Sequence, residues 1–308
     1  MRTSLMMSLG APAGRSPIDV FVGDLAEVHS EGFGRVWASQ LPHEPDLLTI
    51  LAVGLREVDG IAVGTGVLPI QNQHPMLLAQ RALTLSLIGP GRLALGLGLS
   101  HRLVTESMWG VPWDKPLRRM REYLDGLQPL LGGQSADATG ETVSTRGALQ
   151  IPGAPAPPVF LAALGPQMLR LAGRRTDGTV TWMTGPTTLA EHAIPVLRGA
   201  AQDAGRAPTA VQVVAALPVA VTDDTAGLRA RAAEQFAVYG RLPSYRAVLD
   251  REGYPGPEDA AVIGDEDTVA GRLGELRDIG VDEFVGAVFD PSPEGRARTR
   301  ALLRRLDS

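Results

Sequence analysis

Short apolar runs alternate along the chain with longer stretches in which apolar residues recur every three or four positions. The short runs are apolar on both faces, as in strands of a buried parallel sheet, and the longer stretches have the period of covering helices. Several helical stretches begin at a proline, which a first helical turn tolerates. Strands are predicted at 2–9, 35–39, 61–68, 92–99, 159–164, 179–183, 211–221 and 283–289. Helices are predicted at 18–30, 45–58, 75–87, 116–131, 166–174, 186–204, 226–239 and 267–278.

Eight strand–helix units in 308 residues predict an α/β fold, a single (β/α)8 TIM barrel domain over 1–308, rather than an open sheet. Two insertions interrupt the pattern. A small hairpin is expected at about 135–151 with its turn at Gly147, and a segment rich in proline, glycine and charge, about 240–264, is expected to cross the barrel mouth. In the last unit, Asp267 is the expected N-cap and Gly280 the expected end of the helix.

Composition narrows the class of protein. With 44% hydrophobic residues and a net charge of −5, the chain can bury a large core and has no general attraction to nucleic acid. The absence of cysteine excludes disulfides and thiolate chemistry and favours a cytoplasmic location. The five histidines lack the spacings of metal motifs, so no metal site is expected.

The first residues, MRTSLMMSLGAPA, imitate a signal peptide, but their apolar run is short and is interrupted by Ser4 and Ser8. We interpret this segment as the first strand. No apolar run approaches the roughly 18 residues of a membrane span, so a membrane partner is not expected. A small organic molecule is the expected substrate.

Barrel enzymes build their active sites at the carboxyl ends of the strands. The run VGTGVLP has glycines inside a strand, which mark a bulge or a close approach by a ligand, here a planar ring resting near Thr65, Gly66 and Val67. Glycines that let a helix pack closely are the alternative. The other strand ends bring Ser39, Gln40, Gly98 and Ser100 to the same edge.

Two later strand ends have the pattern of anion sites. In AALGPQML, the segment formed by Ala163, Leu164, Gly165, Pro166 and Gln167 would present main-chain N–H groups at a helix start, from its residues other than the proline, and these suit a phosphate. The MTGP segment repeats this arrangement one strand later, with Met183, Thr184 and Gly185 before Pro186. A simple strand-to-helix turn is the alternative for the AALGPQML loop taken alone.

His101 directly follows the strand RLALGLGL. This stretch lacks the third glycine of a dinucleotide fingerprint, and the next clear helix starts only at Pro116, so a Rossmann turn is not expected. A histidine at a barrel mouth can exchange a proton near neutral pH, and a solvated loop histidine is the alternative. Trp109 and Trp113 are expected to bind substrate, with a core or subunit-contact role as the other possibility.

The chain resembles the luciferase-like monooxygenase superfamily, and within it the LLM-class coenzyme F420-dependent oxidoreductases. Four segments carry the resemblance: VGTGVLPIQNQHPMLLAQRALTLSLIGPGRLALGLGLSH, MWGVPWDKPLRRMREYLDGLQPLL, PVFLAALGPQMLRLAGRRTDGTVTW and GDEDTVAGRLGELRDIGVDEFV. The resemblance implies a barrel, usually dimeric, with the ring over a bulge whose non-prolyl cis peptide matches Gly66–Val67. It implies a phosphate site at Leu164–Gln167 and Thr184–Gly185.

The implied reaction is hydride transfer between the deazaflavin C5 and a small organic substrate. His101 stands where the family's glucose-6-phosphate dehydrogenases have a glutamate, and Ser39 or Gln40 replaces their histidine after strand two, which argues against sugar-phosphate oxidation. We expect His101 to donate or accept the accompanying proton. An FMN-dependent monooxygenase with a separate flavin reductase and a non-catalytic coenzyme-binding barrel are the alternatives.

Overall fold

The computed structural model describes residues 1–307, which fold into two compact units. The first unit consists of Met7–Ser30 and Gly34–Ala162. The second consists of Met1–Met6, Glu31–Phe33 and the chain from Ala163 onward. Each unit contains a parallel sheet with helices packed against it.

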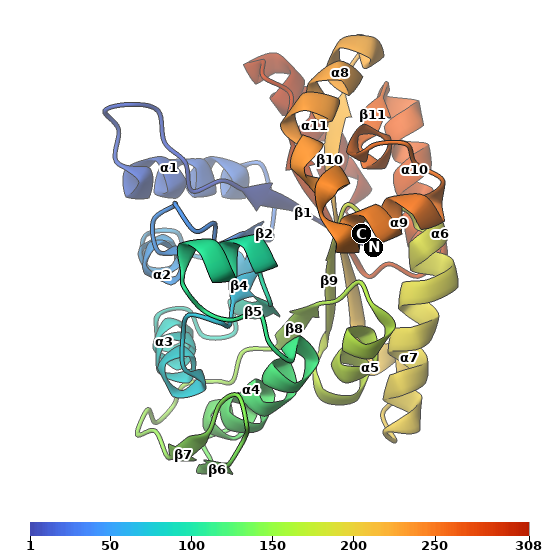
Figure 1. Cartoon of the computed structure of the whole chain (residues 1–308). Helices are drawn as coiled ribbons and strands as arrows, with labels where there is room; N and C mark the ends of the chain where they lie inside the picture. The colour runs from blue at the N-terminus through green and yellow to red at the C-terminus, as the bar shows by residue number, and fades with distance from the viewer. Residues whose placement is uncertain (308) are drawn as a thin grey trace. The chain divides into compact units, whose positions relative to one another are not determined.

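The first unit has parallel strands in the order β2, β3, β5, β8, and the short β4 pairs with β5 (Figure 1). Helices α1, α2 and α3 lie side by side along one flank of this sheet, and α4 packs against α3. The strands are β2 (Arg35–Ala38), β3 (Ala62–Thr65), β4 (Leu68–Pro69), β5 (Leu93–Gly98) and β8 (Val159–Ala162), with the hairpin strands β6 (Ala136–Ala138) and β7 (Thr145–Gly147). The helices are α1 (Pro17–Ser30), α2 (Leu47–Glu57), α3 (Pro75–Ile88), the π-helical η1 (Val104–Met108) and α4 (Pro116–Leu131).

The second unit has parallel strands in the order β9, β10, β12, β1. Strand β10 extends beyond the end of β9, and the short β11 pairs with the last residues of β10. The strands are β1 (Arg2–Met7), β9 (Gly178–Trp182), β10 (Gln212–Val221), β11 (Val262–Gly264) and β12 (Glu283–Val288). The helical elements are α5 (Pro166–Arg175), α6 (Pro186–Thr188), η2 (Leu189–Ala193), α7 (Ile194–Asp203), η3 (Pro208–Ala210), α8 (Thr225–Gln235), η4 (Ala237–Arg241), α9 (Pro243–Glu252), η5 (Pro257–Ala260), α10 (Glu266–Asp278) and α11 (Pro293–Leu306).

Parallel strands that follow one another in chain order and alternate with helices identify the fold class as a (β/α)8 barrel. Each predicted strand is present, and the run 61–68 is divided into β3 and β4 by a bulge. Strand β5 is buried along its whole length, and β10 is buried from Val213 onward, because helices cover the outer face of each sheet and side chains fill its inner face.

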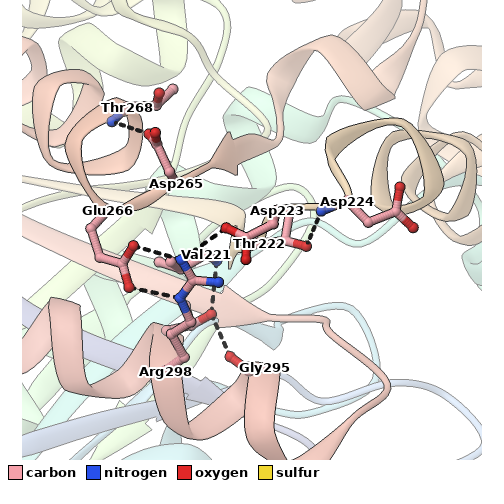
Figure 2. A network of polar contacts seen from close by, with 10 residues as sticks. Val221, Thr222, Asp223, Asp224, Asp265, Glu266, Thr268, Gly295 and Arg298 are labelled. Atoms are coloured by element: carbon pink, nitrogen blue, oxygen red, sulfur yellow. Dashed lines mark hydrogen bonds and ion pairs between the residues drawn. The ribbon is translucent and has the colours of Figure 1, made fainter.

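An ion-pair network fastens the end of β10 to the helices that follow β11 and β12 (Figure 2). The Arg298 guanidinium on α11 donates 2.7 Å hydrogen bonds to both carboxylate oxygens of Glu266 and a 3.1 Å bond to Asp223. Next to it, the hydroxyl of Thr299 accepts from the N–H of Val221 at 2.9 Å. A bidentate arginine–carboxylate pair holds one geometry well, so the carboxyl ends of β10 and β11 are fixed.

Several predicted details are wrong. Gly147, the predicted turn residue of the hairpin, is instead the last residue of β7. The turn of the hairpin lies at 139–144. The N-cap of α10 is Asp265, whose carboxylate accepts from the N–H of Thr268, while Asp267 lies in the first turn. Helices α9 and α11 were not predicted. None of the helices in residues 1–307 is long and apolar enough to cross a membrane.

Candidate active site

A bulge separates β3 from β4 at the carboxyl end of the first unit's sheet. The Gly66–Val67 peptide bond is cis, as the resemblance implied. The end of β2 holds this bulge: Gly66 N–H donates to Ala38 at 2.7 Å, the Ser39 hydroxyl donates to the Gly66 carbonyl, and Gln40 N–H donates to Val67 at 3.3 Å. Gly66 and Val67 are half-buried, so the bulge is partly exposed at the end of the sheet.

The glycines of β5 make room for the bulge itself. A β-carbon at Gly96 would lie 2.0 Å from the carbonyl oxygen of Thr65, and one at Gly98 would lie 2.5 Å from Cγ2 of Val67. From the sequence, the proposed task of the glycines in RLALGLGLSHR is to let a ring lie close to the main chain. In the structure the space beside them is filled by the neighbouring bulge, so Gly98 acts on the candidate site through Val67.

Two predicted binding residues use their side chains within the fold. The Thr65 side chain is fully buried, and its hydroxyl bonds the main chain of Gly96. Gln40 accepts from Leu47 N–H at 2.7 Å and donates to the carbonyls of Leu41 and Pro45, so it shapes the loop before α2. What either residue can offer a ligand is its main chain.

Ser100 and His101 follow β5 directly. Ser100 has φ +58°, a left-handed conformation that is uncommon for a residue other than glycine and is often found at functional sites. His101 is half-buried, and burial lowers the pKa of its imidazole, so the ring is neutral at pH 7. Beside them, the buried Gln71 donates through Nε2 to the carbonyl of Leu99, a contact that sequence reasoning missed.

The segment after His101 carries both predicted tryptophans. Trp109 ends the π-helical turn η1, and the N–H of Trp113 donates to Glu106 at 3.2 Å. Both indoles are half-buried, whereas Leu103 is 71% exposed and Met108 57% exposed. This segment therefore presents apolar side chains to its surroundings within a few residues of His101.

In the second unit, the first predicted anion site is the start of α5. Gly165 is its N-cap residue and Pro166 its first residue, and no side chain caps the helix. Gly165, Pro166 and Gln167 are exposed, whereas Ala163 is buried and Leu164 is half-buried. The first-turn N–H groups of this ten-residue helix have no side-chain cap and can donate hydrogen bonds to an anion.

The second predicted anion site holds a side chain of the protein. Met183 has φ +54°, and the Thr184 hydroxyl donates to the Trp182 carbonyl at 3.1 Å. Beyond Gly185, the N–H groups of Thr187 and Thr188 donate to the carboxylate of Glu252, at the end of α9. No sequence motif marks Glu252, because the contact joins residues more than 60 positions apart.

An aromatic cluster covers the end of β9. Trp182 makes edge-to-face contact with Tyr239 at 5.8 Å, and Tyr239 with Tyr245 at 4.9 Å between ring centroids. Burial raises the pKa of both tyrosines, so both phenols stay protonated. The segment 240–264 thus packs on the end of β9 through Tyr245 and Tyr239, and it contacts the start of α6 through Glu252.

The profile of the luciferase-like monooxygenase family matches residues 16–283. The chain belongs to this family. Among curated relatives, the 5,10-methylenetetrahydromethanopterin reductase of Methanolobus tindarius is 27% identical over 293 residues, covering 86% of this chain and 89% of the relative. The F420-dependent hydroxymycolic acid dehydrogenase of Mycobacterium tuberculosis is 33% identical over 227 residues, covering 69% of this chain and 62% of that one.

Solved structures of luciferase-like proteins confirm the fold. An F420-dependent secondary alcohol dehydrogenase in complex with an F420–acetone adduct superposes with a TM-score of 0.82 at 17% identity, covering 100% of this chain and 99% of that one. The FMN-bound oxygenating constituent of 3,6-diketocamphane monooxygenase from Pseudomonas putida superposes with a TM-score of 0.79 at 19% identity. The match covers 98% of this chain and 96% of that one. At these identities the likeness establishes architecture and leaves the coenzyme to be argued from the site.

Proposed function

We propose that this luciferase-like protein is an F420-dependent oxidoreductase that transfers a hydride between the deazaflavin C5 and a small organic substrate. The observation that carries the proposal is the pairing of an accessible bulge at Gly66–Val67 with a half-buried, neutral His101 after the adjacent strand. A hydride acceptor and a proton-accepting side chain are what dehydrogenation of an alcohol requires.

The residues present fit such a coenzyme in each unit taken by itself. In the first unit, the bulge held by Ser39 offers the half-buried main chain of Gly66 and Val67 to a planar ring. In the second, the exposed, uncapped start of α5 at Gly165–Gln167 offers N–H groups to a phosphate. When bound, the deazaflavin would supply a two-electron hydride acceptor or donor at C5.

The protein's own contribution would be orientation and proton transfer. The neutral imidazole of His101 would accept the proton of a substrate hydroxyl, and in the reverse direction the imidazolium would return it. The lowered pKa supports the accepting role at neutral pH. Leu103, Met108, Trp109 and Trp113 would favour a substrate with apolar groups next to its reacting carbon.

A second candidate is an FMN-dependent monooxygenase, favoured by the FMN-bound structure that shares this architecture. Titration of the purified protein with F420 and with FMN, followed by quenching of coenzyme fluorescence, distinguishes the two. The proposal expects tight binding of F420 and bleaching of its absorbance in a single turnover with a secondary alcohol. Tight binding of FMN alone would refute it, and F420 binding without turnover of any candidate substrate would indicate a non-catalytic coenzyme-binding protein. The predicted homodimer and cytoplasmic location stay predictions.

A further inference from the structure

Glu252 is the last residue of α9, and its carboxylate lies on the Gly185 turn. Its Oε2 accepts from the N–H of Thr187 at 3.2 Å, and its Oε1 accepts from the N–H of Thr188. A β-carbon at Gly185 would lie 2.5 Å from the same Oε2, so the carboxylate packs directly on this residue's main chain. Figure 1 shows α9 beside α6, in agreement with this contact.

These N–H groups belong to the first turn of one continuous helical segment, residues 186–203, formed by α6, η2 and α7. First-turn N–H groups have no acceptor within a helix and attract negative charge. Glu252, by contrast, stands at the carboxyl end of its own helix, where the macrodipole disfavours a carboxylate. Its placement is therefore explained by the turn it contacts rather than by α9.

Two arginines act electrostatically on His192, which follows the turn, and the turn itself carries a buried hydroxyl that makes no hydrogen bond within residues 1–307. The pKa of His192 is lowered by burial and then by the charges of Arg251 and Arg170, and is raised by a hydrogen bond to the main chain of Leu164. The Thr188 side chain is 1% exposed, and its hydroxyl has no partner among residues 1–307. The Glu252 carboxylate therefore leaves one buried hydroxyl donor of the turn unused.

We propose that Glu252 is a determinant of coenzyme affinity: its carboxylate occupies the second anion site, so a phosphate-bearing ligand must displace it. This inference rests on the proposed function in naming F420 as the ligand. Two negative groups on the same pair of N–H donors exclude each other by volume and by charge. The start of α5 has no such competitor, because no side chain caps it.

The test compares Glu252→Gln and Glu252→Ala with the wild-type protein. The amide of Glu252→Gln keeps an acceptor for the turn but removes the charge. We expect the Kd for F420, measured by fluorescence quenching, to fall about tenfold in both variants, equivalent to about 1.4 kcal/mol. Inorganic phosphate should also raise the Tm of both variants more than it raises that of the wild type.

Glu234→Gln is the matched control, since Glu234 is exposed on α8 and its loss changes the net charge equally. Glu234→Gln should leave unchanged both the Kd for F420 and the rise in Tm that inorganic phosphate causes. A Kd for F420 that is unchanged or higher in both Glu252 variants, with no added response to phosphate, would overturn the inference and leave Glu252 as a structural cap. If F420 binds to no variant while phosphate stabilises Glu252→Gln more than wild type, the proposed coenzyme fails and the role of Glu252 stands.

Discussion

The hydroxyl of Thr65 forms a reciprocal pair of hydrogen bonds with Gly96: it donates to the carbonyl at 2.7 Å and accepts from the N–H at 2.8 Å. This pair joins the last residue of β3 to the middle of β5 at the point where the bulge begins. Replacing Thr65 by Val keeps the shape and leaves two buried main-chain groups without this partner. We expect a loss of about 2 to 3 kcal/mol in unfolding free energy, measured as the urea midpoint.

Thr65→Ser is the control for this prediction. It keeps the hydroxyl and loses a methyl group, at a cost of about 1 kcal/mol. A Thr65→Val variant that is as stable as the wild type would show that the reciprocal bonds contribute nothing net.

His101 gives a prediction for pH dependence. Because the base is the neutral imidazole, alcohol oxidation should be constant at higher pH and fall as the pH drops through the pKa of His101. Burial lowers that pKa from its ordinary 6.5, so the acid limb of kcat/KM should lie below pH 6.5. His101→Gln should lose about 100-fold or more in kcat and show no such limb. An unchanged pH profile in this variant would remove His101 from proton transfer.

Ser4 supports a buried carboxylate. Its hydroxyl donates to Glu283 at 2.6 Å, where the Glu283 side chain is almost completely buried and is also bonded by Arg2. Ser4→Ala should lower the unfolding free energy by about 2 kcal/mol, because hydrogen bonds to charged groups are strong. Ser4 lies in the amino-terminal half of β1 and Glu283 is the first residue of β12, so we expect coenzyme affinity to be unchanged.

Ser86 provides the matched substitution. It is equally buried, in α3, but its hydroxyl has no partner among residues 1–307. Ser86→Ala should therefore be neutral or stabilising in the same urea experiment. Equal losses from both serine substitutions would contradict the assignment of the Ser4 effect to Glu283.

A substitution at Gly98 should displace the bulge, because the side chain of Val67 packs against this glycine. In Gly98→Ala the new methyl group would meet Val67, so Val67 must shift. If the coenzyme ring rests on Val67, the Kd for F420 should rise about tenfold, or about 1.4 kcal/mol. Gly23→Ala, on the open surface of α1, should leave the Kd unchanged and stabilise the protein by up to about 1 kcal/mol. Unchanged affinity in Gly98→Ala would place the ring elsewhere.

The strands of the barrel could be predicted because their residues are apolar on both faces, and several helix starts could be predicted because a proline precedes an apolar helical pattern. Helix α11 was missed because the segment PEGRARTRALLRRL is rich in arginine and buries only Thr299, Leu302 and Leu303. Helix α9 was missed for a similar reason, since its buried residues are limited to Val248 and Leu249. Pattern reasoning depends on a wide apolar face, which neither helix has.

The position of the candidate site could be predicted from the sequence. The hydrogen-bond partners of its individual side chains could not. Strand ends located Gly66, Val67 and His101. They could not show that the hydroxyl of Thr65 and the amide of Gln40 are engaged by neighbouring main chain, because such bonds depend on the path of the loops. Nothing in the sequence marked Glu252, because the role of a single glutamate at a helix end depends on which groups its carboxylate contacts. Here these are the N–H groups of Thr187 and Thr188.

The carboxylate over the Gly185 turn has a consequence for ligand discrimination. A free phosphate or sulfate ion gains only the few hydrogen bonds of the turn, and these must be taken from Glu252. A ligand that also binds elsewhere on the protein can offset that competition with its remaining contacts. In the proposed role, the carboxylate of Glu252 would weaken the binding of small abundant anions more than the binding of a large coenzyme, and so would favour the coenzyme.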